Sequence, residues 1–216
     1  GLAKAVEPGE LHGIDVEESQ VETARAAAMT GGHDNATFHV GIVTELPFED
    51  DSFDAAHCHA VLTHIPDTQA ALAEVKRVLK PGGIISCREF ITESSFFEPD
   101  LGALDAVGTL FEDLLELNGG HAQMGKELRH ALGEAGFSNV EASASFESFG
   151  AILDVAFFHG FAIDWFCSPA IIESATSHGL APQEQFDRLR RAFDQWKDHP
   201  GAFAAMAWGE AIGRKP

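Results

Sequence analysis

Short apolar runs alternate with helical patterns over the first 90 residues of the chain. Continuous or alternating apolar residues predict strands, whereas apolar residues three or four positions apart predict helices. Turn residues separate these segments, and Pro81-Gly82-Gly83 ends one of the helical patterns. The order is strand, helix, strand, strand, helix, strand, which is typical of parallel βαβ units. The predicted ranges are Glu10–Val16, Glu17–Met29, Ala36–Gly41, Phe53–His59, Asp67–Leu79 and Ile84–Phe90.

The pattern changes after residue 92. Helical patterns near Leu101–Leu117 and over Gly125–Ala135 precede a predicted strand, Val140–Phe146. A long helical segment, about Phe149–His199, separates that strand from a final apolar run, Ala202–Gly213, which we interpret as the last strand. The chain has no internal repeat and no low-complexity linker, so we expect the helical segment to pack on the sheet.

Composition narrows the class of protein. With 216 residues, 45% of them hydrophobic, the chain is long enough for one large core. Its formal net charge of −20 would repel a phosphate backbone, so we expect neither nucleic acid nor an anionic membrane surface as a partner. The three cysteines form no C-x-x-C pair, which disfavours a disulfide framework and a metal site. We therefore expect a cytoplasmic protein without a membrane span.

An acid stands at the end of the first predicted strand, in Gly13-Ile14-Asp15-Val16. The carboxyl ends of parallel strands are where ligands bind in such sheets, and a carboxylate there can accept hydrogen bonds from ribose hydroxyls. Nicotinamide dehydrogenases use the same arrangement. Asp15 could equally cap the helix that follows, and the two roles are compatible.

Three longer motifs follow in a fixed order. They are Leu46–Asp54, His59–Asp67 and Glu74–Gly83. In this order and at this spacing they resemble the ubiquinone and menaquinone biosynthesis (UbiE-like) branch of class I S-adenosylmethionine (SAM) dependent methyltransferases. The resemblance is specific over about residues 3–90. It implies an α/β Rossmann-like sheet with helices on both faces, an antiparallel strand near the C-terminus, an added helical lid, and SAM as the cofactor.

The resemblance also implies a division of the chain. Residues 1–92 would be part of the SAM-binding core, and 93–135 a helical insertion over the substrate. The C-terminal strands of the same sheet would lie in 136–148 and 202–213, and 149–201 would be a second helical insertion.

Family positions imply a cofactor site residue by residue. Asp15 would hold the ribose hydroxyls, with Val16 against the adenine. Ile42-Val43 stands where many relatives carry an acid followed by an apolar residue. Because Ile42 replaces the acid that would receive the adenine amino group, adenine recognition must rely on apolar contact and backbone groups.

His59 and Ala60 would face the methionine part of SAM. Relatives also have a strand and a G-x-G-x-G turn before the first helix, and that turn lets the backbone approach the methionine moiety closely. Leu2–Gly9 resembles the end of that helix, so the first strand and glycine-rich loop are absent from this sequence. We expect about 40–60 further residues upstream, from the usual size of a βα unit, and a half-built cofactor site without them.

Methyl transfer needs alignment, a dry cavity and sometimes a base. His64 and Glu89 are the catalytic candidates, because they lie near the carboxyl ends of predicted strands. His59 is a further candidate base. The alternatives are that these histidines line the pocket or make structural hydrogen bonds, and that Arg88 and Glu89 form a structural ion pair.

The predicted substrate pocket comprises Arg88, Phe90, His121, Met124 and Trp165. Ten aromatic residues of the later segments supply more ring surface than charge, which favours an apolar or aromatic acceptor. They could instead only join the helices to the sheet. These are Phe96, Phe97, Phe111, Phe146, Phe149, Phe157, Phe158, Phe161, Trp165 and Phe166.

The sequence therefore predicts SAM-dependent methyl transfer to an oxygen, carbon or nitrogen of a small, largely apolar metabolite, by a monomer or homodimer. A non-catalytic SAM-fold binding or scaffold protein is the first alternative, suggested by Ile42 and by the absent loop. A nicotinamide-dependent Rossmann enzyme is the second.

Overall fold

The computed structural model describes residues 1–216, except for the side chain of residue 105. After a short helix, α1 (Leu2–Ala5), the first half of the chain alternates strands and helices as an α/β protein does. Its elements are β1 (Leu11–Asp15), α2 (Glu18–Gly31), β2 (Ala36–Val40), β3 (Phe53–His59), the 3-10 turn η1 (Leu62–His64), α3 (Thr68–Val78) and β4 (Leu79–Phe90).

The second half adds helices at one end of the sheet and two long strands. Its elements are η2 (Thr92–Ser94), β5 (Phe96–Glu98), α4 (Asp105–Leu117), α5 (Met124–Glu134), β6 (Ser138–Phe149), α6 (Ile152–Phe166), α7 (Pro169–Ser177), α8 (Gln183–Lys197) and β7 (Phe203–Arg214).

The strands form two separate sheets. One contains only the parallel pair β1–β2, and the other has the order β3-β4-β7-β5, with β6 also paired to β7. Strands β3 and β4 are parallel, whereas β7 is antiparallel to both β4 and β6. Among the described residues, β1 pairs only with β2 and β3 only with β4, so no ladder of hydrogen bonds joins the two sheets.

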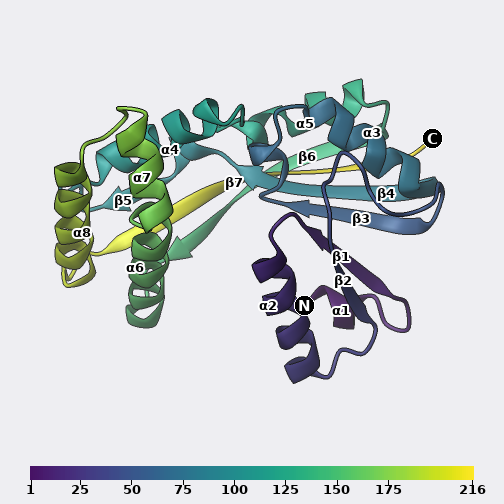
Figure 1. Cartoon of the computed structure of the whole chain (residues 1–216), viewed down its shortest axis with the longest axis horizontal. Helices are drawn as coiled ribbons and strands as arrows, with labels where there is room; N and C mark the ends of the chain where they lie inside the picture. Colours follow the sequence, from purple (N-terminus) through teal and green to yellow (C-terminus); the bar gives the residue numbers. More distant parts are fainter.

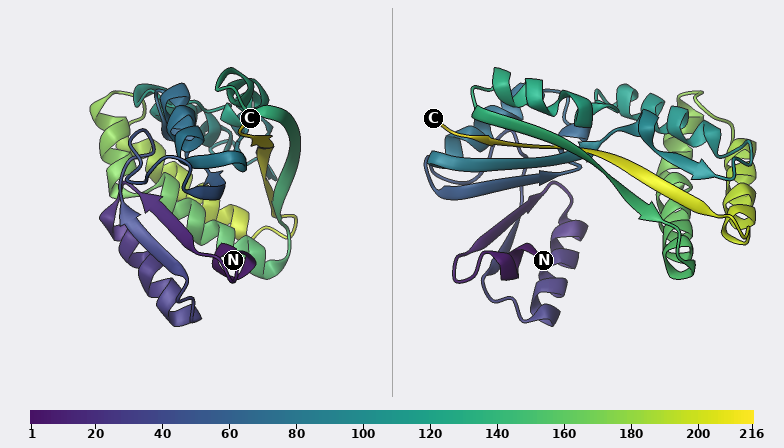
Figure 2. Two further views of the ribbon diagram at one scale, coloured as in Figure 1. Left: turned by 90° about the vertical axis from the view of Figure 1, so that its right-hand side faces the viewer. Right: turned by 180° about the vertical axis from the view of Figure 1, so that it is seen from behind.

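The five-stranded sheet has one covered face and one open face. Helices α3 and α5 lie above it in Figure 1, and the unit of β1, α2 and β2 lies below. The view from behind shows the same separation (Figure 2). On the covered face, Ile85 and Cys87 pack into a core with Leu72, Leu128 and Leu132. The N-terminal unit contacts this body through rings: His12 lies 5.5 Å from Phe48 and 5.6 Å from Phe53, between centroids.

Helix α5 lies very close to the sheet at two glycines. A Cβ atom on Gly209 of β7 would lie only 1.9 Å from the carbonyl oxygen of Gly125 in α5. A Cβ on Gly125 would lie 2.6 Å from the carbonyl oxygen of Glu89. Only glycine permits this approach. The contact fixes α5 against β4 and β7, at the end of the sheet where the candidate site lies.

Most of the predicted elements are confirmed by the structure, including the antiparallel ending of the sheet. The long helical segment is confirmed and consists of three helices, α6 to α8, although its predicted first residue, Phe149, is the last residue of β6. The short strand β5 was not predicted. Strand β4 begins at Leu79 instead of Ile84, since the residues around Pro81-Gly82-Gly83 continue the extended chain.

Within the described part of the chain, no single helix has the length and hydropathy of a membrane span, although α6 and α7 together, bent by 44°, pass that test. All three cysteines are buried thiols. Cys58 and Cys87 stand opposite each other on β3 and β4, and the hydrogen bond between the two thiols together with burial raises the pKa of Cys87. These two thiols are part of the core of the covered face.

Candidate active site

The carboxyl end of β1 presents Asp15 on an exposed edge. Its Oδ1 accepts a hydrogen bond from the backbone N–H of Glu17 (2.8 Å), so the carboxylate orders the start of α2. The backbone oxygen of Asp15 accepts from Gly41 (3.0 Å), which fixes the loop after β2 beside it. Asp15 is therefore not the helix cap that the sequence allowed, because Glu17 is the N-cap of α2, but its bond to Glu17 leaves the carboxylate at the sheet edge where a ribose could reach it.

The loop after β2 holds apolar side chains next to this acid. Ile42 is 47% exposed and forms an isolated bridge with Glu45, and Val16 on the other side is 63% exposed. Val43 packs against the core of the covered face, so it supports the loop from beneath. Exposed apolar side chains on both sides of a carboxylate fit an adenosine group, with the acid toward the ribose and Val16 and Ile42 toward the base.

The carboxyl end of β3 brings His59 and Ala60 to the open side of the sheet. Ala60 has φ +51°, a left-handed conformation that alanine rarely adopts. Its N–H donates to the carbonyl oxygen of Arg88 (2.9 Å), which fixes the turn by which the chain leaves the sheet. Strained residues cluster at functional sites, and this one lies at the predicted methionine end of the cofactor site.

Glu89 is fully buried on the covered face, beneath the turn η1. Its two carboxylate oxygens accept hydrogen bonds from the N–H groups of Val61, Leu62 and Thr63 at 3.0–3.1 Å, and from the Thr63 hydroxyl at 2.9 Å. A carboxylate with four donors around it and no access to solvent has no lone pair left for a substrate proton. The catalytic interpretation of Glu89 is therefore corrected: the residue holds η1 in place.

His64 ends that same turn, and its ring is exposed. Packing around the ring lowers the pKa of His64, and the nearby charge of Glu89 opposes this effect. A neutral imidazole on the carboxyl side of the sheet can accept a proton near neutral pH. His64 therefore remains the better placed of the two catalytic candidates.

Arg88 lies on the open face and not in an acceptor pocket. Its Nη2 is 3.4 Å from Glu147 Oε2 and its Nε is 3.5 Å from Glu210 Oε1. The guanidinium also lies 3.9 Å from the ring centre of Trp208, a cation–π contact. The predicted pairing of Arg88 with Glu89 is wrong, because adjacent residues of a strand point to opposite faces; its partners come from β6 and β7.

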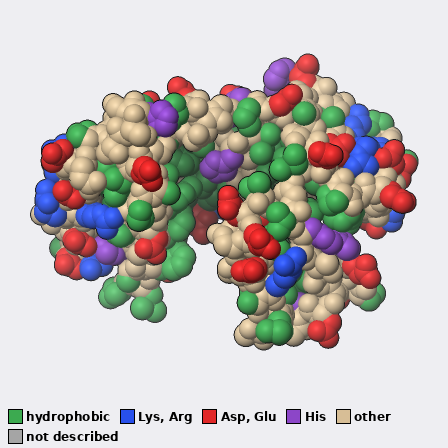
Figure 3. All heavy atoms as spheres, viewed as in Figure 1, with side chains coloured by type: hydrophobic (Ala, Val, Ile, Leu, Met, Phe, Trp, Pro, Cys, Tyr) green, Lys and Arg blue, Asp and Glu red, His purple; other side chains and the backbone are tan. Residues whose placement is uncertain are grey.

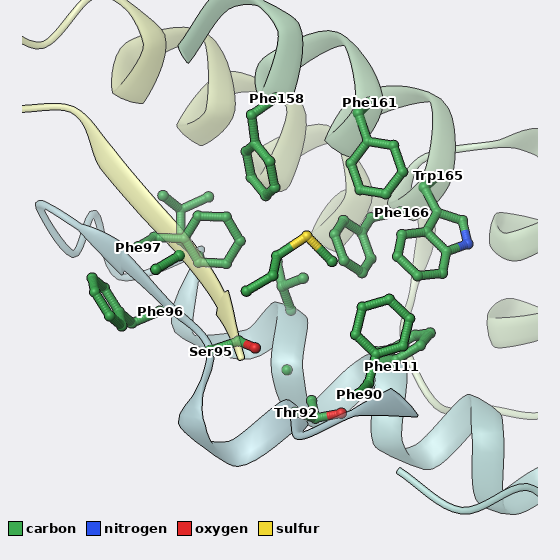
Figure 4. Close-up of a pocket in the computed structure, with 15 residues that line it drawn as sticks. Phe90, Thr92, Ser95, Phe96, Phe97, Phe111, Phe158, Phe161, Trp165 and Phe166 are labelled. Atoms are coloured by element: carbon green, nitrogen blue, oxygen red, sulfur yellow. The ribbon is translucent and has the colours of Figure 1, made fainter. Parts of the chain in front are cut away.

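An apolar cavity of about 180 Å³ opens at the carboxyl end of β4. Figure 4 shows Phe158, Phe161 and Trp165 pointing from α6 toward Phe90 and Phe111. Among the side chains that the structure describes, no charged one lines this cavity. The full lining is Phe90, Thr92, Ser95, Phe96, Phe97, Leu104, Val107, Gly108, Phe111, Phe158, Phe161, Trp165, Phe166, Ala205 and Met206.

The two hydroxyl groups in this lining already have partners. Thr92 Oγ1 donates to the carbonyl oxygen of Ala122 (2.8 Å). Ser95 Oγ donates to that of Ile91 (3.2 Å) and accepts from the N–H of Ala207 (3.0 Å). Both hydroxyl protons are thus already used, so the lining offers few polar partners and suits hydrocarbon or aromatic groups best.

The predicted substrate residues do not all line the same cavity. Phe90 and Trp165 line the apolar cavity, with ring centroids 5.6 Å apart. His121 and Met124 line a separate, more polar groove between α3 and α5. The N–H of His121 donates to Thr63 O (2.8 Å), so this glycine-rich turn docks on η1 and does not cover the cavity. Sequence reasoning correctly placed most of the cavity rings but missed Gly108 and Met206, for which the pattern gave no signal.

Figure 3 shows the molecule hollowed between the N-terminal unit and the helical end that contains α6. A parallel strand pair continued by antiparallel strands, with helices packed on the sheet and an apolar cavity at the carboxyl end of β4, agrees with the predicted class I methyltransferase fold.

Comparison with known proteins agrees. The model of the Methyltransf_31 family, described as a methyltransferase domain, matches residues 1–136. The chain therefore belongs to this methyltransferase domain family. It is 35% identical over 152 residues to demethylmenaquinone methyltransferase of Staphylococcus aureus, covering 64% of this chain and 62% of that protein. The chain spans only 34% and 62% of the lengths of the first two curated relatives that it matches.

Solved structures confirm the fold. The YcgJ protein from Bacillus subtilis superposes with a TM-score of 0.60 at 21% identity, covering 99% of this chain and 87% of that one. Phosphoethanolamine N-methyltransferase 2 of Haemonchus contortus, solved with SAM, gives a TM-score of 0.54 at 16% identity, covering 96% and 43%. The predicted family of SAM-dependent methyltransferases and their fold are thus confirmed.

Proposed function

We propose that this chain transfers the methyl group of SAM to an oxygen, carbon or nitrogen of a small, largely apolar or aromatic acceptor. The observation that carries the proposal is the aromatic cavity at the carboxyl end of β4, whose lining ring Phe90 stacks on Trp208 at 4.1 Å, with His59 on the other side of Trp208 at 5.0 Å. SAM, when bound, supplies a methyl group on a sulfonium centre. The chain's part is to hold both molecules in line and to exclude water.

The cofactor would lie along the carboxyl edge of the strands. Asp15 would accept hydrogen bonds from the ribose, and Val16 and Ile42 would contact the adenine. Their exposure next to that carboxylate supports these roles. Val43 would support the loop beneath the adenine, since it packs on the core. His59 and Ala60 would border the methionine part, at the strained end of β3.

The proposal includes a further strand between β1 and β3. Unpaired strand edges leave backbone N–H and C=O groups without partners, which is costly when they are buried. A strand followed by a glycine-rich turn in this place would bring backbone N–H groups beside His59. The break between the two sheets supports this arrangement.

The acceptor's apolar body would occupy the cavity, against Phe90 and Trp165. Its reacting atom would then lie toward the cofactor edge, where His64 is the candidate base if one is used. The net charge of −20 supports a small-molecule acceptor over nucleic acid. A cytoplasmic monomer or homodimer is consistent with this proposal.

Gly108 offers a direct test of the cavity, because it lies in α4 and lines the space. A Cβ there would meet only Thr92 Cγ2, at 4.0 Å. Gly108→Leu should fill the cavity and lower methylation of acceptors from a metabolite extract with labelled SAM by at least about tenfold, the loss expected when about 1.4 kcal/mol of contact is removed. SAM binding, measured by calorimetry, should stay unchanged.

Gly108→Ala is the matched control. It adds one methyl group without filling the space, so acceptor methylation should persist and the helix should gain about 0.5–1 kcal/mol. Equal methylation by the Leu and wild-type chains would show that the acceptor binds elsewhere.

A non-catalytic SAM-binding or scaffold role is the second candidate, and Ile42 favours it. An apolar side chain in place of an acid lowers the specificity of adenine recognition, although apolar contact remains. SAM binding without any labelled product from a broad extract would support this role. Family membership favours SAM over a nicotinamide cofactor, and NAD should leave the melting temperature unchanged.

A further inference from the structure

A row of polar side chains crosses four strands on the open face of the sheet. His59 of β3 stands opposite Arg88 of β4, Arg88 opposite Glu210 of β7, and Glu210 opposite Ser143 of β6. Neighbours in this row contact one another: Arg88 Nη1 lies 3.2 Å from His59 Nε2, and Ser143 Oγ lies 3.0 Å from Glu210 Oε2. The row ends at His59, at the predicted methionine end of the cofactor site.

Arg88 is held in position from several sides. Glu210 and Glu147 contact its guanidinium at 3.5 and 3.4 Å, and Trp208 lies beneath it at 3.9 Å. Glu210 is itself held by the hydroxyl of Ser145, at 2.6 Å. The Arg88 group that contacts His59 therefore has little freedom to turn away.

The contact between Arg88 and His59 has only one chemical interpretation. A guanidinium carries donors and no acceptor, so Arg88 donates and His59 Nε2 accepts. A histidine whose Nε2 has a lone pair is neutral, and its single ring proton is on Nδ1. Protonation of Nε2 would break the bond and place two cations 3.2 Å apart.

The other charges around His59 agree with a neutral ring. Burial lowers the pKa of His59, and the charges of Arg88 and of His57 lower it further. Glu89 and Glu147 act in the opposite direction but do not reverse the shift. The imidazole is thus neutral at neutral pH, which preserves the Arg88 bond.

We propose that Arg88 is a positioning residue that fixes His59 in the Nδ1–H form, so that His59 donates a hydrogen bond to an oxygen at the methionine end of SAM. This inference rests on the proposed function for its ligand. It removes His59 from the candidate bases, because its basic nitrogen is occupied by Arg88. His59 binds the cofactor, whereas proton removal, where the acceptor needs it, is left to His64.

The tautomer can be measured without any ligand. Long-range ¹H–¹⁵N correlation spectra of the ¹⁵N-labelled chain at pH 7.5 should show His59 with a protonated Nδ1 and a bare Nε2. Arg88→Met removes the donors but keeps a long apolar stem over Trp208. In that variant His59 should redistribute toward the Nε2–H form, and its pKa should rise toward the ordinary value of about 6.5.

Arg214→Met is the matched control, because Arg214 is on the same face of the sheet and donates only to Gly82 O, at 3.2 Å. It should leave the His59 signals unchanged. An Nε2–H form in the wild-type chain, or a tautomer that Arg88→Met does not alter while the remaining spectrum stays folded, would overturn the proposal.

A second measurement tests whether His59 donates a hydrogen bond from Nδ1 to the cofactor. Asparagine at position 59 places an amide nitrogen near the Nδ1 position, whereas glutamine places it near Nε2. In calorimetric titrations with S-adenosylhomocysteine, His59→Asn should keep its affinity within about threefold of wild type, and His59→Gln should bind about tenfold more weakly, as for one lost hydrogen bond. His57→Asn, two residues earlier on the same face, should change nothing.

The reverse order of the two His59 variants would overturn the donor role. Absence of S-adenosylhomocysteine binding in the wild-type chain would instead contradict the proposed function. In that case the tautomer spectra would still decide whether Arg88 fixes His59.

Discussion

The two faces of the five-stranded sheet carry opposite kinds of side chain, although alternate residues of the same strands supply both. On β4, Ile85, Cys87 and Glu89 point to the face covered by α3 and α5, whereas Arg88 and Phe90 point to the open face. The covered face is apolar except for Glu89, whose hydrogen bonds are complete. The open face carries the polar row from His59 to Ser143, and Phe90 on the same face lines the aromatic cavity.

The covered face therefore mainly stabilises the fold, whereas the open face carries the groups of the candidate site. The covered face buries the side chains that fix α3, α5 and η1, and thereby places the ends of β3 and β4. The open face also buries apolar side chains at its far end, where Phe149, Ala204 and Met206 pack with the helices, but its polar groups near β3 and β4 lie where a cofactor and an acceptor could reach them. We therefore expect substitutions on the covered face to change mainly the free energy of unfolding, and those on the open face to change mainly binding.

The largest effect should come from Gly209→Ala on the covered face. The new Cβ would lie 1.9 Å from the Gly125 carbonyl oxygen, which belongs to the backbone of α5 and cannot turn away as a side chain would. Helix α5 must therefore shift from the sheet. We expect the free energy of unfolding to fall by about 3–5 kcal/mol, as for severe overpacking, measured by urea denaturation.

Gly133→Ala provides the control within α5, because a Cβ there would meet nothing within 4 Å. It should raise the free energy of unfolding by about 0.5–1 kcal/mol, the helix propensity difference. If Gly209→Ala and Gly133→Ala were equally stable, the close approach of α5 to β7 would be wrong.

Glu89→Gln should have the next largest effect on stability. It also tests whether Glu89, on the covered face, is structural or catalytic. The carboxylate accepts four hydrogen bonds beneath η1, and an amide would turn an N–H donor toward one of those donors. We expect a loss of about 2–3 kcal/mol in unfolding free energy, since buried donors lose their partner. Glu93→Gln, at an exposed pair with Lys126, should cost less than about 1 kcal/mol.

The same variant distinguishes a structural from a catalytic Glu89. If Glu89 were the base, Glu89→Gln would abolish methyl transfer while the urea midpoint stayed at the wild-type value. A lowered midpoint with residual transfer at low temperature would agree with its place under η1.

The sequence predicted the covered face better than the open one. The apolar periodicity at Leu72, Val75 and Val78 predicts a helix packed on the protein core. This prediction does not depend on which residues the helix contacts, because an apolar stripe on a helix is stable only when it is buried. Asp15 and His59 were selected because strand ends carry ligands in this fold, and their roles in cofactor binding stay predictions. The prediction for Glu89 was wrong because its partners include the backbone N–H groups around η1. The pattern of side chains in a sequence does not reveal hydrogen bonds to the backbone.

For the acceptor cavity, the sequence predicted only that aromatic residues would line it, and not which ones. The rings of α6 were recognised as a set, but which of them meet depends on how the helices pack at the end of β7. Phe158 and Trp165 line the cavity, whereas Phe157 is 67% exposed on the same helix. His121 and Met124 were grouped with Phe90 in the predicted pocket but line a separate groove, because the turn that contains His121 docks on η1.

The smallest predicted effect is the pH dependence of the free energy of unfolding. As the pH falls, the first change should come from the histidines His59 and His64. Burial and Arg88 lower the pKa of His59, and burial lowers that of His64, so the unfolded chain binds more protons just below pH 6.5. The free energy of unfolding should therefore fall as pH drops from about 6.5 toward 5. Urea denaturation of His59→Asn should show a shallower fall over this range.

A second fall should follow at lower pH, from carboxylates. The hydrogen bond from Ser145 lowers the pKa of Glu210, and that from Arg77 lowers the pKa of Glu74. Both groups stabilise the fold above about pH 4.5, and this stabilisation is lost as the pH falls through their lowered values. Because Arg88 contacts both His59 and Glu210, Arg88→Met should flatten the histidine step and move the carboxylate step to higher pH. If both steps were unchanged in Arg88→Met, the polar row of the open face would not be coupled through Arg88.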